Sequence, residues 1–138
     1  MLNAERAANA ITGNGVSSYI TESRLNNDEV NSMYIEVQDS GLVTVTLVWT
    51  DPAGVAQTDE DDLTPTLVND LDIRVYSSDS TYYPWFLEPN DKSNNFTDPA
   101  KKGDNFRDNV EKIEAGLPAG KYLLSISHKE TLVNNYQN

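Results

Sequence analysis

The chain of 138 residues contains no cysteine. Disulfide bonds, zinc–thiolate centres and thiol nucleophiles are therefore excluded, and the fold must be held by its core or by bound metal ions. No apolar run is long enough to cross a membrane, so membrane insertion is not expected. The N-terminus shows no basic segment followed by a hydrophobic one, so no signal peptide is visible.

Basic residues are scarce, because 10 Lys and Arg stand against 22 Asp and Glu and the net charge is −12. Nucleic acids and anionic membrane surfaces are bound through Lys and Arg, so neither is an expected partner. The acidity has two interpretations: a solvated surface that keeps the protein in solution, or the binding of cations.

One segment, residues 2–11, has the composition of a helix, and Gly13 and Gly15 are expected to end it. Apolar and polar residues alternate over 33–37 and again over 43–49, with turn residues at 39–41 between them. This pattern predicts a β-hairpin.

Further alternation predicts strands at residues 71–75 and 122–128. Residues 82–87 form an aromatic strand that Pro84 interrupts, which places it at a sheet edge. In residues 110–115 the apolar positions are out of step, so a β-bulge is expected there. Short strands separated by turns predict an all-β fold, an antiparallel β-sandwich preceded by a short helix.

Two stretches combine carboxylates with the start of a strand pattern: L-V-N-D-L-D-I-R-V-Y at 67–76 and G-D-N-F-R-D-N-V-E-K-I at 103–113. Antiparallel strands reverse at each connection, so these stretches and the loop after Trp49 are expected at one end of the sandwich. The carboxylates expected to converge there are Asp51, Asp70, Asp72, Asp104 and Asp108, with Asn69, Asn105 and Asn109 as supplementary oxygen donors.

Calcium takes six to eight oxygen ligands, so this convergence suggests a structural Ca²⁺ site. The alternative is that these Asp and Asn side chains cap turns and keep the surface hydrated. Both long loops involved, 51–66 and 88–108, have a length that is typical of functional, metal-bound or mobile loops.

Catalytic candidates are few. His128 is the single histidine and lies in S-I-S-H, where its serine neighbours are not spaced for a nucleophile–base contact. Trp85, Tyr82 and Tyr83 are candidates for a sugar-stacking platform, whereas Trp49 continues an inward stripe and is expected in the core. The sequence therefore predicts a binding or structural role.

Several motifs together resemble a known family: V-T-L-V-W-T-D-P, L-V-N-D-L-D-I-R-V-Y, Y-P-W, G-D-N-F-R-D-N-V-E-K-I and L-P-A-G-K-Y-L-L-S-I-S-H-K. They resemble the β-domain that follows the catalytic domain in bacterial secreted subtilisin-like serine proteases, over about residues 33–132. L-N-A at residues 2–4, with Ala7 and Ala8, is similar to the last helix of such catalytic domains. Residues 1–15 are then a remnant of that helix plus linker, and residues 16–138 are the β-domain.

The resemblance implies a jelly-roll sandwich, similar in shape to the P domain of proprotein convertases. It implies a non-catalytic module that stabilises the protease domain of the same parent chain, shapes substrate access, and often holds calcium. The catalytic triad has no counterpart here, and a secreted or cell-surface bacterial location is implied. Two rival functions remain open: a carbohydrate-binding module and a cell-surface adhesion domain.

Overall fold

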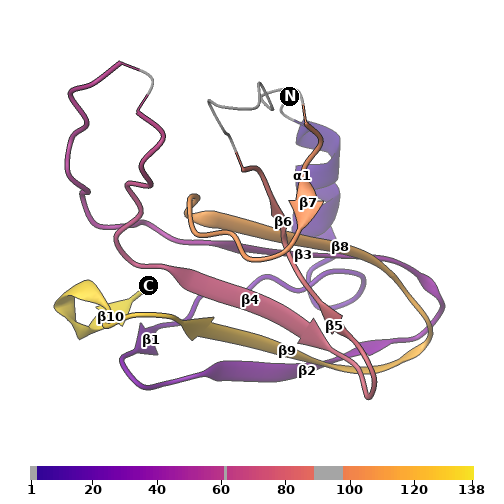
Figure 1. Cartoon of the computed structure of the whole chain (residues 1–138). Helices are drawn as coiled ribbons and strands as arrows, with labels where there is room; N and C mark the ends of the chain where they lie inside the picture. Colours follow the sequence, from indigo (N-terminus) through magenta and orange to yellow (C-terminus); the bar gives the residue numbers. More distant parts are fainter. Residues whose placement is uncertain (1–2, 61, 89–97) are drawn as a thin grey trace.

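Two antiparallel sheets face each other in the computed structural model, which describes residues 3–60, 62–88 and 98–138. The larger sheet has the strand order β2-β9-β4-β5, and the smaller consists of β3 and β8 (Figure 1). With one short helix, α1, at the N-terminal end, this arrangement confirms the predicted all-β antiparallel sandwich.

The strand bounds of the two main sheets are β2 Asn31–Val37, β3 Gly41–Val48, β4 Leu71–Tyr76, β5 Thr81–Tyr82, β8 Val110–Leu117 and β9 Gly120–His128. Two short pairs lie beside them: β1 (Leu25–Asn26) with β10 (Tyr136–Gln137), and β6 (Trp85–Phe86) with β7 (Lys101–Lys102). A 3-10 turn, η2, spans Val133–Asn135. Pro84 separates β5 from β6, and β5 lies at the edge of its sheet, as predicted.

The predicted hairpin of residues 33–49 is wrong, although both of its strands are present. β2 pairs with β9, and β3 pairs with β8 in the opposite sheet. The turn between β2 and β3 therefore crosses from one sheet to the other, as does the turn between β8 and β9 (Figure 1). The physical reason is burial, because crossing sheets lets Ile35 and Val37 pack in the same core as Val43 and Val45.

The core lies between the sheets. Its fully buried members are Ile73, Val75, Ile113, Leu117 and Tyr122. Burying an Ile, Val or Leu side chain contributes about 1.5–3 kcal/mol, so this cluster contributes strongly to stability. A second cluster at the β1 end contains Leu25, Trp49, Leu71 and Leu132.

Trp49 is in the core, as expected, and its substitution gives a first prediction. The indole Nε1–H donates to the carbonyl oxygen of Asn69 at 3.1 Å, and the ring is 3% exposed. Replacing Trp49 with Phe is expected to cost about 1–3 kcal/mol in the free energy of unfolding, because that buried carbonyl loses its donor. Urea unfolding measures the loss, and Trp85→Phe, on the exposed side of β6, is the control. Equal losses in the two variants would contradict the assignment.

The predicted bulge in residues 110–115 is absent, because β8 pairs with β3 without interruption from Leu117↔Gly41 to Val110↔Val48. The register instead turns Glu111 inward in phase with Ile113, and leaves Val110 exposed. A carboxylate therefore occupies an inward position of the strand.

Helix α1 (Ala4–Thr12) confirms the predicted N-terminal helix from Ala4 onward. It begins at Asn3, whose side-chain oxygen accepts a hydrogen bond from the backbone N–H of Arg6 at 2.9 Å. None of its residues is buried. Among the described residues, no helix has the length and apolar character needed to cross a membrane.

Candidate functional site

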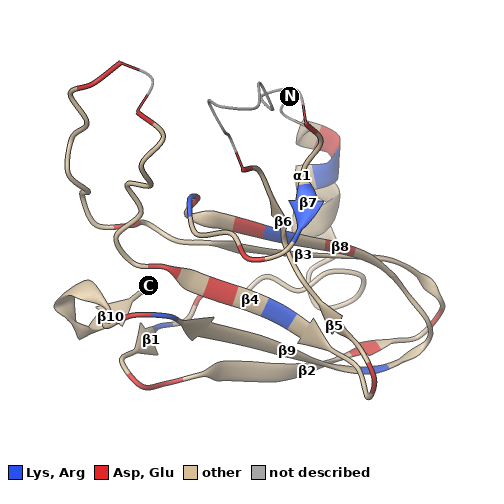
Figure 2. Ribbon diagram, viewed as in Figure 1, with Lys and Arg blue, Asp and Glu red and all other residues tan. Residues whose placement is uncertain are grey.

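Three of the five predicted carboxylates meet on the face of β4, joined by a fourth from β8. Figure 2 shows acidic positions at the start of β4 and on β8, with a basic position further along β4. The members are the carboxylates of Asp70, Asp72, Asp104 and Glu111 and the cations of Arg74 and Lys129. This set is called the carboxylate cluster below.

Lys129, in the turn after β9, contacts three of these carboxylates. Its Nζ lies 2.7 Å from Asp104 Oδ2, 2.9 Å from Asp70 Oδ2 and 3.7 Å from Asp72 Oδ1. Its backbone N–H also donates to the carbonyl oxygen of Asp70 at 3.1 Å, which fixes the turn against the start of β4. One ammonium group thus joins the turn after β9 to two other segments, the start of β4 and the segment that carries Asp104.

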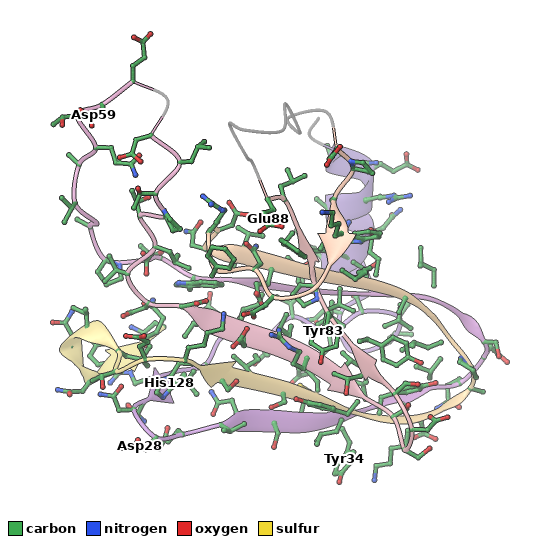
Figure 3. The ribbon with its side chains drawn as sticks, in the orientation of Figure 1. Asp28, Tyr34, Asp59, Tyr83, Glu88 and His128 are labelled. Carbon is green, nitrogen blue, oxygen red and sulfur yellow. The ribbon has the colours of Figure 1, made fainter. Side chains whose placement is uncertain are left out.

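Arg74 holds the other side of the cluster. Its Nη2 lies 2.8 Å from both Asp72 Oδ1 and Asp104 Oδ1, and its Nη1 donates to the carbonyl oxygen of Ile73 at 2.7 Å. The guanidinium carbon lies 5.0 Å from the ring centre of Tyr83, which is labelled in Figure 3. Asp104 therefore bridges the two cations, one with each carboxylate oxygen.

Glu111 approaches β4 from the opposite sheet and is fully buried, with a side-chain exposure of 0%. Its Oε2 accepts a hydrogen bond from the backbone N–H of Ile73 at 2.6 Å. Since β5 pairs only with Val75 and Tyr76, no strand among the described residues pairs with the first half of β4 on that side. Glu111 and Arg74 satisfy the N–H and the carbonyl of Ile73 in place of a strand.

Burial sets the ionisation of the cluster. It raises the pKa of Glu111 to about 7, and together with a hydrogen bond to Asp104 it raises the pKa of Asp72 to about 6. Burial also raises the pKa of Asp70. For Asp104, burial acts in the same direction, but hydrogen bonds from Lys129 and Arg74 outweigh it and lower the pKa.

The structure does not bring Asp51 and Asp108 to the cluster. Both oxygens of Asp51 accept backbone hydrogen bonds, from Val68 at 2.7 Å and from Asn69 at 2.8 Å, so this side chain closes the base of the 51–68 loop. Asp108 is exposed and lines, together with Asp51 and Arg107, a separate open cavity of about 460 Å³.

The three asparagines proposed as supplementary ligands make hydrogen bonds to other residues of the chain. Asn69 bonds Val133 and Gln137 through its side chain, and Asn109 donates to the carbonyl oxygen of Trp49 at 2.7 Å. Asn105 donates to the carbonyl oxygen of Val110. Only the bonds of Asn105 are local, as in the turn-capping alternative, whereas those of Asn69 and Asn109 join segments far apart in the sequence.

As arranged, these residues do not fit calcium. The space between the carboxylates is taken by the ammonium of Lys129 and the guanidinium of Arg74, whereas calcium requires six to eight oxygens at about 2.3–2.6 Å. Across the described ranges, no group of three or more His, Cys, Asp or Glu is placed to hold a metal ion. Two buried carboxylate oxygens, Asp70 Oδ1 and Glu111 Oε1, have no hydrogen-bond partner. The calcium site stays a prediction.

His128 is engaged by the loops around it. Its Nε2 accepts a hydrogen bond from the backbone N–H of Asp28 at 3.1 Å, and its Nδ1 lies 2.7 Å from the carbonyl oxygen of Glu130. Figure 3 shows His128 and Asp28 at the same end of the sandwich. Both ring nitrogens are thereby committed to backbone groups.

The three aromatic residues proposed for sugar stacking do not form one platform. Tyr82 packs edge-on against Tyr122 in the core, with ring centres 6.3 Å apart. Trp85 and Tyr83 are partly exposed, but each has a cation over its ring, with Lys102 Nζ 3.7 Å from the ring centre of Trp85. The carbohydrate-binding function has no further support from this geometry and remains untested.

Comparison with models of known protein families and with curated protein sequences finds no match for the chain. The functional assignment below therefore rests on the motifs and on the geometry of the described residues.

Proposed function

We propose that this chain is the non-catalytic β-domain of a secreted bacterial subtilisin-like serine endopeptidase. In this proposal it stabilises the catalytic domain that precedes it and shapes access of protein substrates. The motifs shared with such proteases support the family. The exposed apolar face of α1 is the structural observation that supports the catalytic domain as its partner.

Helix α1 has an apolar stripe without a partner among the described residues. Ala4, Ala7, Ala8 and Ile11 recur at the spacing that places them on one face of a helix. Ile11 is 67% exposed, and in Figure 1 the helix stands on the outer side of β3 and β8. The chain that follows exposes further apolar side chains, namely Val16, Tyr19 and Ile20.

A nine-residue helix is marginal in water unless tertiary contacts cover its apolar face. The sandwich does not provide this cover, so the proposal places it on the catalytic domain. The segment that resembles the last helix of that domain is the same segment whose apolar stripe is uncovered.

We propose a non-catalytic role because the charged side chains of the cluster and His128 are bound to other groups of the chain. Arg74 and Lys129 pair with the carboxylates of the cluster, and His128 binds backbone groups. None of these contacts presents a nucleophile beside a base.

The test compares the catalytic domain with and without this chain joined to it. We expect the joined form to lose peptidase activity more slowly on heating, and Ile11→Asp to remove part of that protection. In the isolated chain Ile11→Asp is expected to leave the unfolding temperature nearly unchanged, because Ile11 is exposed and belongs to neither core cluster. Asn9→Asp, on another face of α1, is the matched control.

Two results would count against the proposal. One is an equal rate of thermal inactivation with and without this chain. The other is labelling of the isolated chain by a fluorophosphonate, a reagent that reacts with activated serine.

A further inference from the structure

The carboxylate cluster has the convergence that a hard cation requires, but its cation is part of the chain. Asp70 precedes β4, Asp72 lies within it, and Asp104 follows β7. Oxygens of all three lie within 3.7 Å of a single nitrogen, Nζ of Lys129. Calcium sites likewise gather several carboxylate oxygens around one centre.

Lys129 Nζ fills the position between the three carboxylates. The two shortest contacts of Nζ, 2.7 and 2.9 Å, are those of charge-assisted hydrogen bonds, and the side chain of Lys129 is 29% exposed. Arg74 lies on the far side and shares Asp72 and Asp104 with Lys129. A divalent ion entering this space would meet two fixed positive charges at short range.

We propose that Lys129 is the built-in cation of a three-carboxylate site formed by Asp70, Asp72 and Asp104, and that it takes the place of a divalent metal. The ammonium group of Lys129 then holds the start of β4 and the segment of Asp104 together, with Arg74 beside it. Removing that group, while keeping the carboxylates, opens a site for a divalent cation such as Ca²⁺.

The variant that isolates this property is Lys129→Met, because methionine keeps most of the aliphatic stem and removes only the charge. The three carboxylates then repel one another, with Arg74 left to neutralise them on one side. A divalent ion at the former position of Nζ relieves that repulsion, so calcium is expected to stabilise the variant.

The experiment measures thermal unfolding of the wild type and of Lys129→Met, in chelator and in excess calcium. We expect the wild-type midpoint to be the same in both solutions. Lys129→Met is expected to unfold at a lower temperature in chelator and to gain roughly 5–10 °C at a hundredfold excess of calcium over its dissociation constant. Lys121→Met, whose ammonium stacks on Tyr34, is the matched control and is expected to show no response to calcium.

A wild-type midpoint that rises with calcium would overturn the proposal, because a divalent ion would then be the native cation. An unchanged midpoint of Lys129→Met in chelator would also overturn it. If Lys129→Met folds in neither solution, a double variant that also carries Asp70→Asn tests the proposal, because it has one carboxylate fewer in the site. Folding of the double variant supports like-charge repulsion as the cause, and its failure contradicts the proposal.

Discussion

Replacing Arg74 with methionine is expected to lower the free energy of unfolding by about 3–5 kcal/mol, the cost of removing one partner of a buried ion pair. The side chains of Arg74 and Asp72 are 13% and 12% exposed. Without the guanidinium, the one ion pair left to Asp72 among the described residues is the longer 3.7 Å contact to Lys129, and the carbonyl of Ile73 loses its donor. The contact to Asp104 adds less, because that carboxylate is 48% exposed and can be hydrated.

Urea unfolding of wild type and Arg74→Met measures this loss. Arg6→Met, on the exposed surface of α1, is the control and is expected to change stability by no more than about 0.5 kcal/mol. A double variant that also carries Asp72→Asn should recover part of the loss, because the unpaired charge is then gone. A loss no larger than that of Arg6→Met would show that the cluster does not stabilise the fold.

Glu111 is expected to make the stability of the fold depend on pH. We expect Glu111→Gln to become more stable than wild type by about 3 kcal/mol as pH rises from 4.5 to 8, which converts the pKa shift of Glu111 at about 1.4 kcal/mol per pH unit. Burial raises this pKa from 4.5 to about 7, so the folded state holds a proton that the unfolded state releases. The contribution of Glu111 to stability therefore falls as pH rises through this window and stays low above it.

Glutamine stays neutral at every pH and keeps an oxygen that can accept from the Ile73 N–H. The other groups that act on Glu111 are Asp72, Arg74 and Lys129, and they are present in both proteins. Asp72 has a raised pKa and so also disfavours the folded state as pH rises, but this effect largely cancels in the comparison.

The measurement is urea unfolding of wild type and Glu111→Gln at pH 4.5 and pH 8. Glu36→Gln, on the exposed face of β2, is the control and is expected to change both values equally. If Glu111→Gln has the same pH dependence as the wild type, Glu111 is not the buried acid that the geometry describes.

Strand positions could be predicted because side-chain alternation is local. The segments 33–37, 43–49, 71–75 and 122–128 all contain strands. Strand partners could not be predicted in the same way, and the supposed hairpin of β2 and β3 shows why. Alternation defines an apolar face, but either a hairpin or a crossing between sheets can bury that face.

The candidate site could likewise be predicted only in part from the sequence. Strand reversal predicts that Asp70, Asp72 and Asp104 lie together, as they do, but a pattern of oxygen donors does not reveal Arg74, Lys129 and Glu111 as their partners. A signal was present for two of them. Arg74 is two residues from Asp72 and therefore shares its face of β4, and Glu111 is two residues from Ile113, in phase with the core.

The sequence by itself determined a cysteine-free, acidic, all-β chain with carboxylates at the ends of its strands. Only the tertiary structure decided which strands pair and what neutralises those carboxylates. The reason is distance along the chain. Lys129 and Asp70 are 59 residues apart, and their contact at 2.9 Å exists only once β9 has paired with β4.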